Sequence, residues 1–525
     1  MVKRFDLVVV GGGGSGSVVA SRVSENPDLV VLLLEAGDTP RSSLAFPQAL
    51  LDGAQVPGAR PAVGHHWSYD VQLTSEKSYS VFRGRVLGGS TATNGGYFMR
   101  ARLEDFVSWS QAGNPAWAYD RVLPFLRRLE TDRDYGLNEI HGGSGPVPVC
   151  RPSMTGARAA AFADACAELG YPYEPDKNKQ GPASFGPVPL NIADGVRWNT
   201  GLAYVVPAIA RPNLTVAGGC TVERIRFRGT RAVGLDIRSE GKFSTIAADE
   251  IVLSAGAFES PRLLMRSGVG PAGDLRAVGL PVVHDIPGVG RTFNDHPQVI
   301  LEWTPNRDLG EAAESWISGC LNFKSAGGPN SGDLQILQSN VAMSVLTGHQ
   351  VASSDGALPL LISVNSPFPT GSVRLKSRDP QAPLDIQYRY LSTAADSARI
   401  REAVRTAIGL LSTKAFTAVA NGPRDLDPRT ARDDRVLDQW ILERLGTTLH
   451  ACGTAPMGPI NNPDAVVDQF GRVHGIDGLR IADTSILPAA PLRGPAATAV
   501  LIGEIVADSL TTDHSAQRAV TTGQA

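Results

Sequence analysis

The stretch from Phe5 to Gly37 constrains the fold of this chain more than any other. It begins with an apolar, β-branched run, Leu7 to Val10, which is typical of a buried parallel strand. The run ends in glycines that fit the pattern G-x-G-x-x-G, namely Gly11, Gly13 and Gly16. The first allows a tight turn, the second lets the backbone approach a pyrophosphate, and the third lets a helix pack closely on the strand.

A helix and a second strand are predicted after the glycine turn. From Ser15 the apolar residues recur with a longer period, which predicts a helix whose free N–H groups and positive dipole end face the phosphates. Leu29 to Leu34 predicts the second strand, and Glu35 follows Gly16 by about 20 residues, the distance expected for a carboxylate that binds a ribose. The unit predicts a dinucleotide site; the alternative is a glycine turn without a ligand. Because Glu35 would repel a 2′-phosphate, FAD or NAD is expected.

The composition is that of a soluble, globular enzyme. The chain has 525 residues, of which 42% are hydrophobic and 19% charged, and its formal net charge is −3. This length predicts two or three domains, and the charge balance argues against a nucleic-acid partner. The five cysteines lie far apart and include no C-x-x-C pair. We therefore expect reduced thiols, with neither a disulfide framework nor a metal site.

The sequence also bears on where the protein resides. No window approaches the roughly 18 uninterrupted apolar residues of a membrane helix. The apolar start is superficially similar to a signal peptide, but Asp6 interrupts it. Together with the reduced thiols, these features predict a cytoplasmic protein without a transmembrane segment. Peripheral contact with the inner face of the membrane is left open.

Beyond the first unit, the chain alternates strands and helices. The residues after Pro207 alternate apolar and polar side chains and predict a small antiparallel sheet. Glu250 to Ser254 predicts a buried strand that leads into a helix ending at Gly268. The last helix is predicted from Pro495 to Leu510, followed by a frayed tail after Thr511.

Five separated motifs are similar, in the same order, to those of one family. They are RGRVLGGSTATNGG from Arg83, SAGAFESPRLLMRSGVGP from Ser254, PVVHDIPGVGRTFNDHP from Pro281, LHACGTAPMG from Leu449 and DQFGRVHGIDGLRIADTSILP from Asp468. Five independent motifs in one order are far more specific than any one of them. The chain resembles the glucose–methanol–choline (GMC) oxidoreductases over nearly its whole length, least clearly between residues 300 and 365.

The resemblance implies an α/β fold in two parts. A Rossmann-like, FAD-binding domain of the GMC type is expected from residues 1–300 and 446–525, with inserted substrate-cap segments near residues 38–80 and 130–200. A second, α+β substrate-binding domain, residues 301–445, is expected on an antiparallel sheet. The resemblance also implies oxidation of an alcohol CH–OH group by hydride transfer to the flavin N5 atom, with loss of the hydroxyl proton to a base.

The resemblance further assigns residues to FAD. The first glycines and Glu35 are expected to hold the ADP half, Val222 to meet the adenine through its backbone, and Asp483 to lie near the ribityl–pyrophosphate region. The full predicted set is Gly11, Gly13, Gly14, Ser15, Gly16, Glu35, Ala36, Arg85, Gly88, Gly89, Thr93, Asn94, Gly95, Gly96, Val222, Ala255, Asp483, Pro495 and Ala496. Thr93 stands where some members of the family carry a histidine bonded covalently to FAD. Because threonine cannot form that bond, non-covalent FAD is predicted.

The resemblance makes His450, in LHACGTAPMG, the predicted general base. An imidazole with a pKa near ~6.5 can take a hydroxyl proton at neutral pH. The family usually adds a second histidine or asparagine near the start of the last helix, but here that position is Gly494. Arg493, or a histidine from the pair His65 and His66, is one hypothesis for what fills the gap. A roomier site for a bulky substrate is the other.

The start of the last helix carries a second clue. Gly494, Pro495, Ala496 and Ala497 include no side chain that caps a helix, so its N–H groups and dipole are available to a ligand. Because a reduced flavin is anionic at its pyrimidine end, this helix start is a predicted electrostatic partner for it. The alternative is a cap satisfied by water.

One more histidine and one cysteine of the family motifs are expected to have structural roles. His296, in NDHP, is expected to be structural, and Cys452, inside the motif of the base, is expected to be a small buried hydrophobe.

Two features point to a subgroup. NGGYFMRA after the first motif and LRGPAATAVLIGE near the end are similar to the GMC dehydrogenases encoded with mycofactocin, a peptide-derived redox cofactor. The predicted substrate is accordingly an alcohol or reduced mycofactocin, and the acceptor a quinone, the respiratory chain or oxygen. An oxygen-using alcohol oxidase, a hydroxynitrile-lyase-type flavoprotein and a non-catalytic flavoprotein are the alternatives.

Overall fold

The strand–turn–helix–strand unit predicted at the start of the chain is present. The computed structural model describes residues 4–59, 65–310, 315–328, 331–347, 356–368 and 371–522. Strand β1 (Arg4–Val10) leads through the glycine turn into helix α1 (Gly16–Val23), and β2 (Val31–Leu34) pairs with β1 in parallel. The apolar side chains of both strands are buried, as expected inside a parallel sheet.

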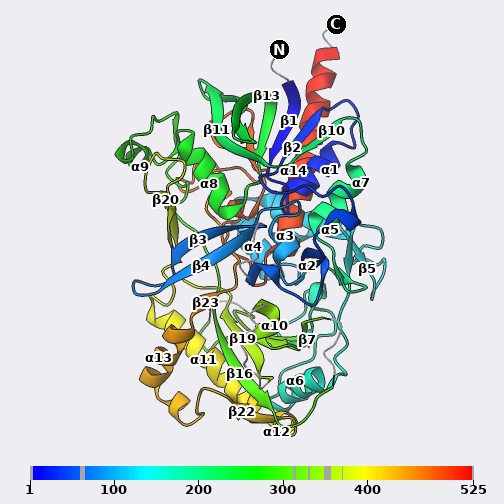
Figure 1. Ribbon diagram of the computed structural model, residues 1–525, viewed down its shortest axis with the longest axis vertical. Coiled ribbons are helices and arrows are strands. Elements are labelled where there is room, and N and C mark those ends of the chain that lie inside the picture. The colour runs from blue at the N-terminus through cyan, green and yellow to red at the C-terminus, as the bar shows by residue number, and fades with distance from the viewer. Residues whose placement is uncertain are drawn as a thin grey trace.

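These strands belong to a mixed sheet of seven described strands (Figure 1). The order is β10 (Leu214–Ala217), β2, β1, β13 (Lys242–Leu253), β12 (Arg231–Ser239) and β11 (Cys220–Arg228), with β24 (Leu479–Ile481) against the end of β13. β13 joins two kinds of pairing, because its first half is antiparallel to β12 and its second half is parallel to β1. The predicted antiparallel strands thus extend the parallel sheet.

Strand β10 is the exception to the antiparallel prediction. It pairs in parallel with β2, with Leu214 opposite Val31. The reason is the helical segment before it, a π-helical turn at Gly201–Val205 followed by α7 (Val206–Ala208), which packs on α1. The chain re-enters the sheet after a helical crossover, and such crossovers produce parallel neighbours.

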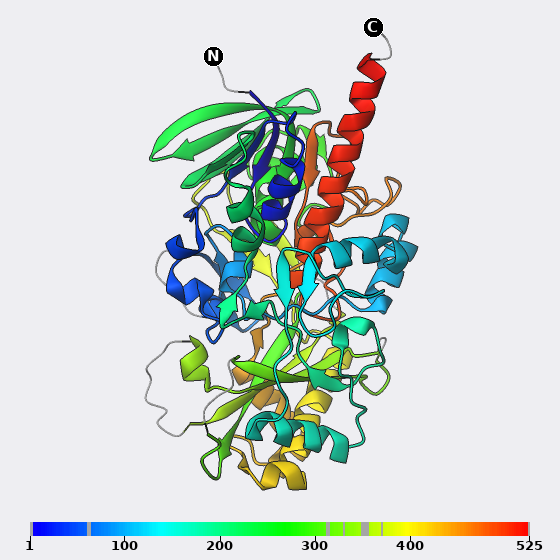
Figure 2. The same ribbon diagram turned by 90° about the vertical axis from the view of Figure 1, so that its right-hand side faces the viewer.

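The C-terminal helix α14 (Ala496–Thr522) runs beside α1 (Figure 2). Gly503 allows the close approach, because a Cβ atom added there would lie 2.6 Å from Cβ of Val18. The helix continues well past Thr511, so the frayed tail predicted there is wrong. The physical reason is an ion-pair cluster in which Asp513 binds the guanidinium groups of Arg472 and Arg480.

A second, antiparallel sheet forms the other half of the molecule (Figure 1). Its described strands are β22 (Ala420–Pro423), β16 (Pro297–Pro305), β19 (Leu358–Val364), β18 (Leu334–Ser339), β17 (Ile317–Phe323) and β7 (Phe185–Pro187), with β23 (Gly446–Thr447) beside β16. Helix α11 (Ala394–Leu411) packs against β18 and β19, and α6 (Ala157–Glu168), α12 (Lys414–Thr417) and α13 (Asp434–Arg444) surround it. The fold is therefore the predicted one, a Rossmann-like part and a part built on an antiparallel sheet.

A third sheet connects segments that are far apart in the sequence. Its order is β20 (Ser372–Leu375), β21 (Leu384–Gln387), β3 (His66–Gln72) and β4 (Ser78–Gly84). In Figure 1, β3 and β4 cross the middle of the molecule between the two large sheets. The domain boundaries proposed from the sequence, at residues 300/301 and 445/446, stay predictions.

The remaining elements are short. The helices are α2 (Gln48–Leu51), α3 (Ser90–Thr93), α4 (Leu103–Gln111), α5 (Tyr119–Arg128), α8 (Gly256–Arg266), α9 (Ala272–Ala277) and α10 (Met343–Thr347). The strands are β5 (Glu130–Asp132), β6 (Val147–Val149), β8 (Ile192–Ala193), β9 (Val196–Arg197), β14 (Val269–Gly270) and β15 (His284–Asp285). Helix α8 ends just before Gly268, whose φ is +87°, so the predicted glycine end is confirmed.

Two general expectations can be compared with the described residues. All five cysteine thiols are free. Within the same part of the chain, no helix combines the length and the apolar character needed to cross a bilayer.

A buried histidine joins three carboxylates beside β5. His141 Nδ1 lies 3.0 Å from both Glu130 and Asp132, and its Nε2 lies 2.8 Å from Asp176. Burial opposes the imidazolium charge, but the hydrogen bonds to the carboxylates outweigh it and raise the pKa of His141 to about 10. The ring is therefore a cation at neutral pH.

Two arginines complete this ionic group. Arg151 binds Asp132 at 2.9 Å and Asp176 at 2.8 Å, and Arg100 binds Glu130 at 2.6 Å. Glu130, Asp132 and His141 are close enough together to ligate a metal ion. Arg151 also binds the partly exposed Asp134 at 3.1 Å, so three cations already pair with every one of these carboxylates and the group is explained as an ion network.

His141→Asn is predicted to lower the free energy of unfolding by about 3–5 kcal/mol at neutral pH, because it leaves buried carboxylates without their cation. The raised pKa means that the contribution of His141 is fully present below about pH 6.5 and is lost as the pH rises to about 10. Urea denaturation across this range measures it, with His514→Asn on α14 as the control. A difference from wild type that grows with pH would contradict the assignment.

Candidate active site

The glycine turn lies at the carboxyl end of β1 and requires glycine for its shape. Gly11 has a φ of +100°, and a Cβ atom there would lie 2.4 Å from the carbonyl oxygen of Ser254. A second glycine loop, at Gly88 and Gly89, packs against it. The Gly88 N–H group donates to the Gly12 carbonyl at 2.7 Å, and a Cβ atom on Gly89 would lie 2.7 Å from the Cα atom of Gly13. The two loops therefore touch through their backbones.

The N-terminus of α1 has no side-chain cap. The hydroxyl of Ser15 donates instead to the carbonyl oxygen of Ala499 in α14, at 2.6 Å. Gly14 also faces Ala499, since a Cβ atom on Gly14 would lie 3.3 Å from that residue's methyl group. The starts of α1 and α14 thus lie together. They include Gly16, Pro495 and Ala496, which are predicted to bind FAD. An uncapped helix start favours an anionic ligand.

Glu35 lies at the carboxyl end of β2 and is only 5% exposed. Its carboxylate accepts hydrogen bonds from the backbone N–H groups of Gly12 (2.9 Å) and Gly37 (2.8 Å), on either side of Ala36. Burial raises the pKa of Glu35 to about 7, against the effect of those hydrogen bonds. Val222 lies nearby on β11, at a bulge in the pairing with β12.

The loop from Arg85 to Gly96 contains further residues that are predicted to bind FAD. The guanidinium of Arg85 stacks 4.6 Å from the ring centroid of Trp67. Asn94 accepts a hydrogen bond from the Gly96 N–H group at 2.9 Å, and the Gly95 carbonyl accepts one from the Trp316 indole at 2.7 Å. The loop backbone is thus held at its far end by an aromatic side chain of the second sheet.

Thr93 and Asp483 are both buried. The Thr93 hydroxyl points back to the carbonyl oxygen of Ser90, 3.4 Å away. Asp483 accepts hydrogen bonds from the Gly256 N–H group (2.9 Å) and the Ser260 hydroxyl (2.6 Å), so it fixes the start of α8 next to Ala255. Burial raises the pKa of Asp483.

These features fit a dinucleotide. Two glycine backbones in contact, an uncapped helix start and a buried acid at the end of the second strand converge at one edge of the parallel sheet. This is the arrangement that holds a pyrophosphate and a ribose at the carboxyl ends of the strands.

His450 lies beside the position predicted to carry the family's second polar residue. A Cβ atom added to Gly494 would lie 3.1 Å from His450 Nε2. The other ring nitrogen, Nδ1, lies 2.8 Å from the Thr448 hydroxyl and 3.0 Å from Nδ1 of His296. Burial lowers the pKa of His450 well below its ordinary value, so the imidazole is neutral. Nε2 thus faces Gly494, while Nδ1 is held by Thr448 and His296.

The gap opposite His450 is occupied by Tyr97. Its ring carbon Cδ1 would lie 3.0 Å from a Cβ atom on Gly494, and its hydroxyl lies 3.2 Å from Oε1 of Gln335. Arg493 is fully buried and points elsewhere, donating to the carbonyl oxygens of Lys177 and Arg100. Of the two neighbouring candidates, Gly494 is therefore the one that faces His450.

The pair His65 and His66 makes its contacts at the third sheet. His65 Nδ1 lies 3.8 Å from Asp38, and the His66 ring packs edge-on against Phe82 at 4.9 Å.

Three residues of the site were not found from the sequence. Tyr97 stands within NGGYFMRA and Thr448 directly before LHACGTAPMG, but no spacing marks either residue. His296 was expected to be structural, yet it lies against His450 from 154 residues away. Only the fold brings β16 and the loop after β23 together, so no local pattern identifies this pair.

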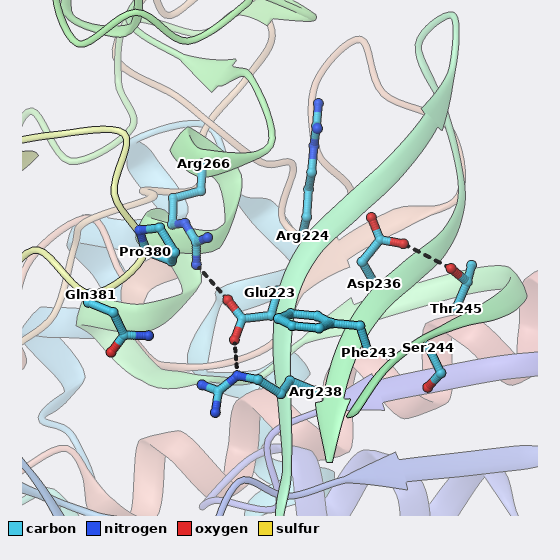
Figure 3. A pocket seen from close by; sticks show the side chains of 10 residues that line it. All are labelled: Glu223, Arg224, Asp236, Arg238, Phe243, Ser244, Thr245, Arg266, Pro380 and Gln381. Carbon is cyan, nitrogen blue, oxygen red and sulfur yellow. Dashed lines mark hydrogen bonds and ion pairs between the residues drawn. The ribbon is translucent and has the colours of Figure 1, made fainter. Parts of the chain in front are cut away.

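A surface groove of about 500 Å³ lies apart from these residues (Figure 3). Figure 3 shows Glu223 bridging Arg238 and Arg266 across it. It contains none of the predicted site residues. Its lining consists of Glu223, Arg224, Asp236, Arg238, Phe243, Ser244, Thr245, Arg266, Pro380 and Gln381.

Comparison with known proteins gives the class of the molecule. Two family models described as GMC oxidoreductase match residues 5–298 and residues 367–503. The chain belongs to the GMC oxidoreductase family and is an FAD-dependent oxidoreductase. The family resemblance seen in the motifs is confirmed, as is the fold.

Relatives match along nearly the whole chain. An uncharacterized GMC-type oxidoreductase from the thcA 5′ region of Rhodococcus erythropolis is 40% identical over 504 residues, covering 95% of this chain and 97% of the relative. Oxygen-dependent choline dehydrogenase of Rhizobium etli is 32% identical, covering 97% and 95%. Pyridoxine 4-oxidase from Mesorbium loti has a similar structure, with a TM-score of 0.88, 29% identity, and 96% and 99% of the two chains covered.

Gly89→Ala is predicted to abolish FAD retention, because the new methyl group would push the second glycine loop away from Gly13. The flavin-to-protein absorbance ratio of the purified protein measures this. Gly241→Ala is the matched control, since Gly241 also has a positive φ (+76°) but open space at its Cβ position. Equal flavin content in the two variants would show that the loop contact is not needed.

Proposed function

We propose that the protein oxidises a CH–OH group of an alcohol with His450 as the general base. The observation that carries this proposal is the placement of His450, whose Nε2 faces Gly494 beside the ring of Tyr97, while Nδ1 is engaged by Thr448 and His296. FAD, when bound, supplies the acceptor for the hydride of the alcohol. The names of the relatives, a choline dehydrogenase and a pyridoxine oxidase, support an alcohol as substrate.

The neutral state of His450 suits this role. Burial disfavours the imidazolium and lowers the pKa of the ring, so its Nε2 lone pair is available at neutral pH. Removal of the hydroxyl proton in the transition state, when the hydride leaves, contributes roughly 10²–10⁴ to the rate.

The residues around the sheet edge have distinct proposed tasks. The glycine turn with the start of α1 holds the pyrophosphate, and Glu35 binds the ribose. Val222 meets the adenine, and Asp483 with Ala255 borders the linker. Arg85 and the loop through Asn94 to Gly96 would lie along the flavin, and the start of α14 at Pro495 and Ala496 would favour the negative charge of the reduced flavin.

Tyr97 takes the place of the family's second histidine or asparagine. Its ring edge already fills the space in front of Gly494, which argues against a simply roomier site. We propose that the substrate hydroxyl is held by His450 alone and that Tyr97 forms the wall beside it. Arg493 does not face the substrate in this proposal; it donates a hydrogen bond to the carbonyl oxygen of Lys177 and so fixes that backbone.

The chemical class of the substrate and that of the electron acceptor are further parts of this proposal. Reduced mycofactocin, implied by the subgroup resemblance, stands beside small alcohols as a candidate. A quinone, the respiratory chain or oxygen is the candidate acceptor, with peripheral membrane contact if a membrane quinone is used. The proposed domains keep the boundaries predicted from the sequence.

Anaerobic bleaching of the flavin absorbance by an alcohol is the predicted result for the wild-type protein. His450→Ala is predicted to slow this reduction by about 10²–10⁴, as measured by rapid mixing against a panel of alcohols and reduced mycofactocin. His474→Ala, a histidine that contacts the Gly458 carbonyl, is the control. An unchanged rate in His450→Ala would refute the role of the base. Turnover without bleaching would instead indicate a lyase.

Acid precipitation is predicted to release all flavin into the supernatant, because the Thr93 hydroxyl cannot form the covalent link of some relatives. Flavin absorbance in the pellet and in the supernatant measures the result. Flavin that stays with the denatured polypeptide would refute non-covalent binding.

A further inference from the structure

Two imidazoles, the buried His296 and the half-buried His450, meet at the base of the site. Nδ1 of His296 and Nδ1 of His450 are 3.0 Å apart, and the rings cross edge to face with an interplanar angle of 82°. Burial lowers the pKa of both rings, that of His296 to about 3. Two neutral imidazoles at this distance share one proton, so one Nδ1 donates and the other accepts.

The direction of this hydrogen bond decides whether His450 can act as a base. If His450 donates from Nδ1, its Nε2 carries a lone pair toward Gly494 and can take a proton. If His296 donates, the proton of His450 sits on Nε2, and that nitrogen cannot accept another. The tautomer is therefore a condition for the proposed chemistry.

Thr448 favours donation by His450. Its hydroxyl lies 2.8 Å from His450 Nδ1 and 3.3 Å from Oδ1 of Asp295. Oδ1 of Asp295 is an acceptor, because the backbone N–H groups of His296 (2.7 Å) and His450 (2.8 Å) both donate to it. The Thr448 proton is directed to this carboxylate, so the hydroxyl oxygen presents a lone pair to an N–H group on His450 Nδ1.

The other side of His296 does not oppose this direction. Nε2 of His296 has no hydrogen-bond partner among the described residues, so no contact there requires its lone pair, and Nδ1 can serve as the acceptor for His450.

The charged groups around the pair do not reverse this arrangement. Asp295 is fully buried, and Arg83 Nη2 lies 3.8 Å from its second carboxylate oxygen, Oδ2. Arg83 also donates to the carbonyl oxygen of Leu449 at 2.8 Å. The carboxylate and the guanidinium thus fix the backbone that carries the rings, and neither contacts a ring nitrogen.

We propose that His296 is a positioning residue that accepts a hydrogen bond from Nδ1 of His450 and thereby holds His450 in the tautomer with a free Nε2 lone pair. The inference rests on the proposed function, because it assigns a role to the neighbour of the base. When Nε2 takes the hydroxyl proton of the alcohol, the N–H group on Nδ1 stays bonded to His296 and the imidazolium remains paired. No other bond changes at the pair.

The test compares two substitutions at one position. His296→Asn keeps an acceptor, a side-chain carbonyl, near the place of Nδ1, whereas His296→Leu removes it at similar volume. In protein labelled with 15N-histidine, the nitrogen chemical shifts report which nitrogen of His450 carries the proton, and comparison with His450→Gln assigns the signal. We expect an Nδ1–H tautomer in the wild type and in His296→Asn, and a shift toward Nε2–H in His296→Leu.

Anaerobic flavin reduction gives the second measurement. His296→Leu is expected to be slower than wild type by about tenfold or more, as for other bases that lose the partner fixing their tautomer. The loss is expected to be the same between about pH 6 and 9, because the two tautomers carry the same charge. His296→Asn is expected to recover most of the rate.

The outcomes separate this inference from the proposed function. An Nε2–H tautomer in the wild type overturns the inference whatever the activity. So does a folded His296→Leu protein, with an unchanged melting temperature, that keeps the wild-type tautomer and rate. A His296→Asn protein as slow as His296→Leu also overturns it, since packing alone would then explain the effect. If no alcohol bleaches the wild-type flavin, the proposed function fails, and the nitrogen shifts still decide the role of His296.

Discussion

The contact between two glycine loops is the constraint on which the site depends. The turn after β1 and the loop after β4 meet through the backbones of Gly13 and Gly89, with no room for a methyl group between them. This contact brings a segment near residue 12 and one near residue 88 to the same sheet edge, where Glu35 and the start of α14 also lie. A flat, extended cofactor needs such a floor of bare backbone, since side chains would hold it at a distance.

One buried carboxylate, that of Asp295, holds the two histidines of the site in place. Asp295 accepts hydrogen bonds from the main chains of His296 and His450, so both rings project from a common anchor. Burial keeps both imidazoles neutral, and a neutral pair is defined by where its single shared proton sits. The site therefore depends on hydrogen-bond direction more than on charge.

Local patterns in the sequence predicted the first unit, the family and the end of α8, and they identified His450 and Gly494, which the fold brings together. Local patterns are insufficient to predict contacts between segments that are distant in the sequence. β10 became parallel because of a helical crossover, and α14 continued past Thr511 because Asp513 binds two arginines. The sequence predicts a structural role for His296, and the 154 residues that separate it from His450 leave their contact without a local signal. Tyr97 was missed because only the backbone position of Gly494 reveals which ring it faces.

The third sheet also limits how the molecule can open. β4 runs directly into the glycine loop, while β3 is linked to the segment after β21 by hydrogen bonds from the Tyr388 and Tyr390 N–H groups to the carbonyls of Gln72 and Leu73. A hinge motion that separated the two large sheets would have to break these backbone hydrogen bonds and displace the glycine loop after β4. Small molecules would therefore reach the imidazole of His450 by displacement of local loops, while the third sheet holds the two large sheets together.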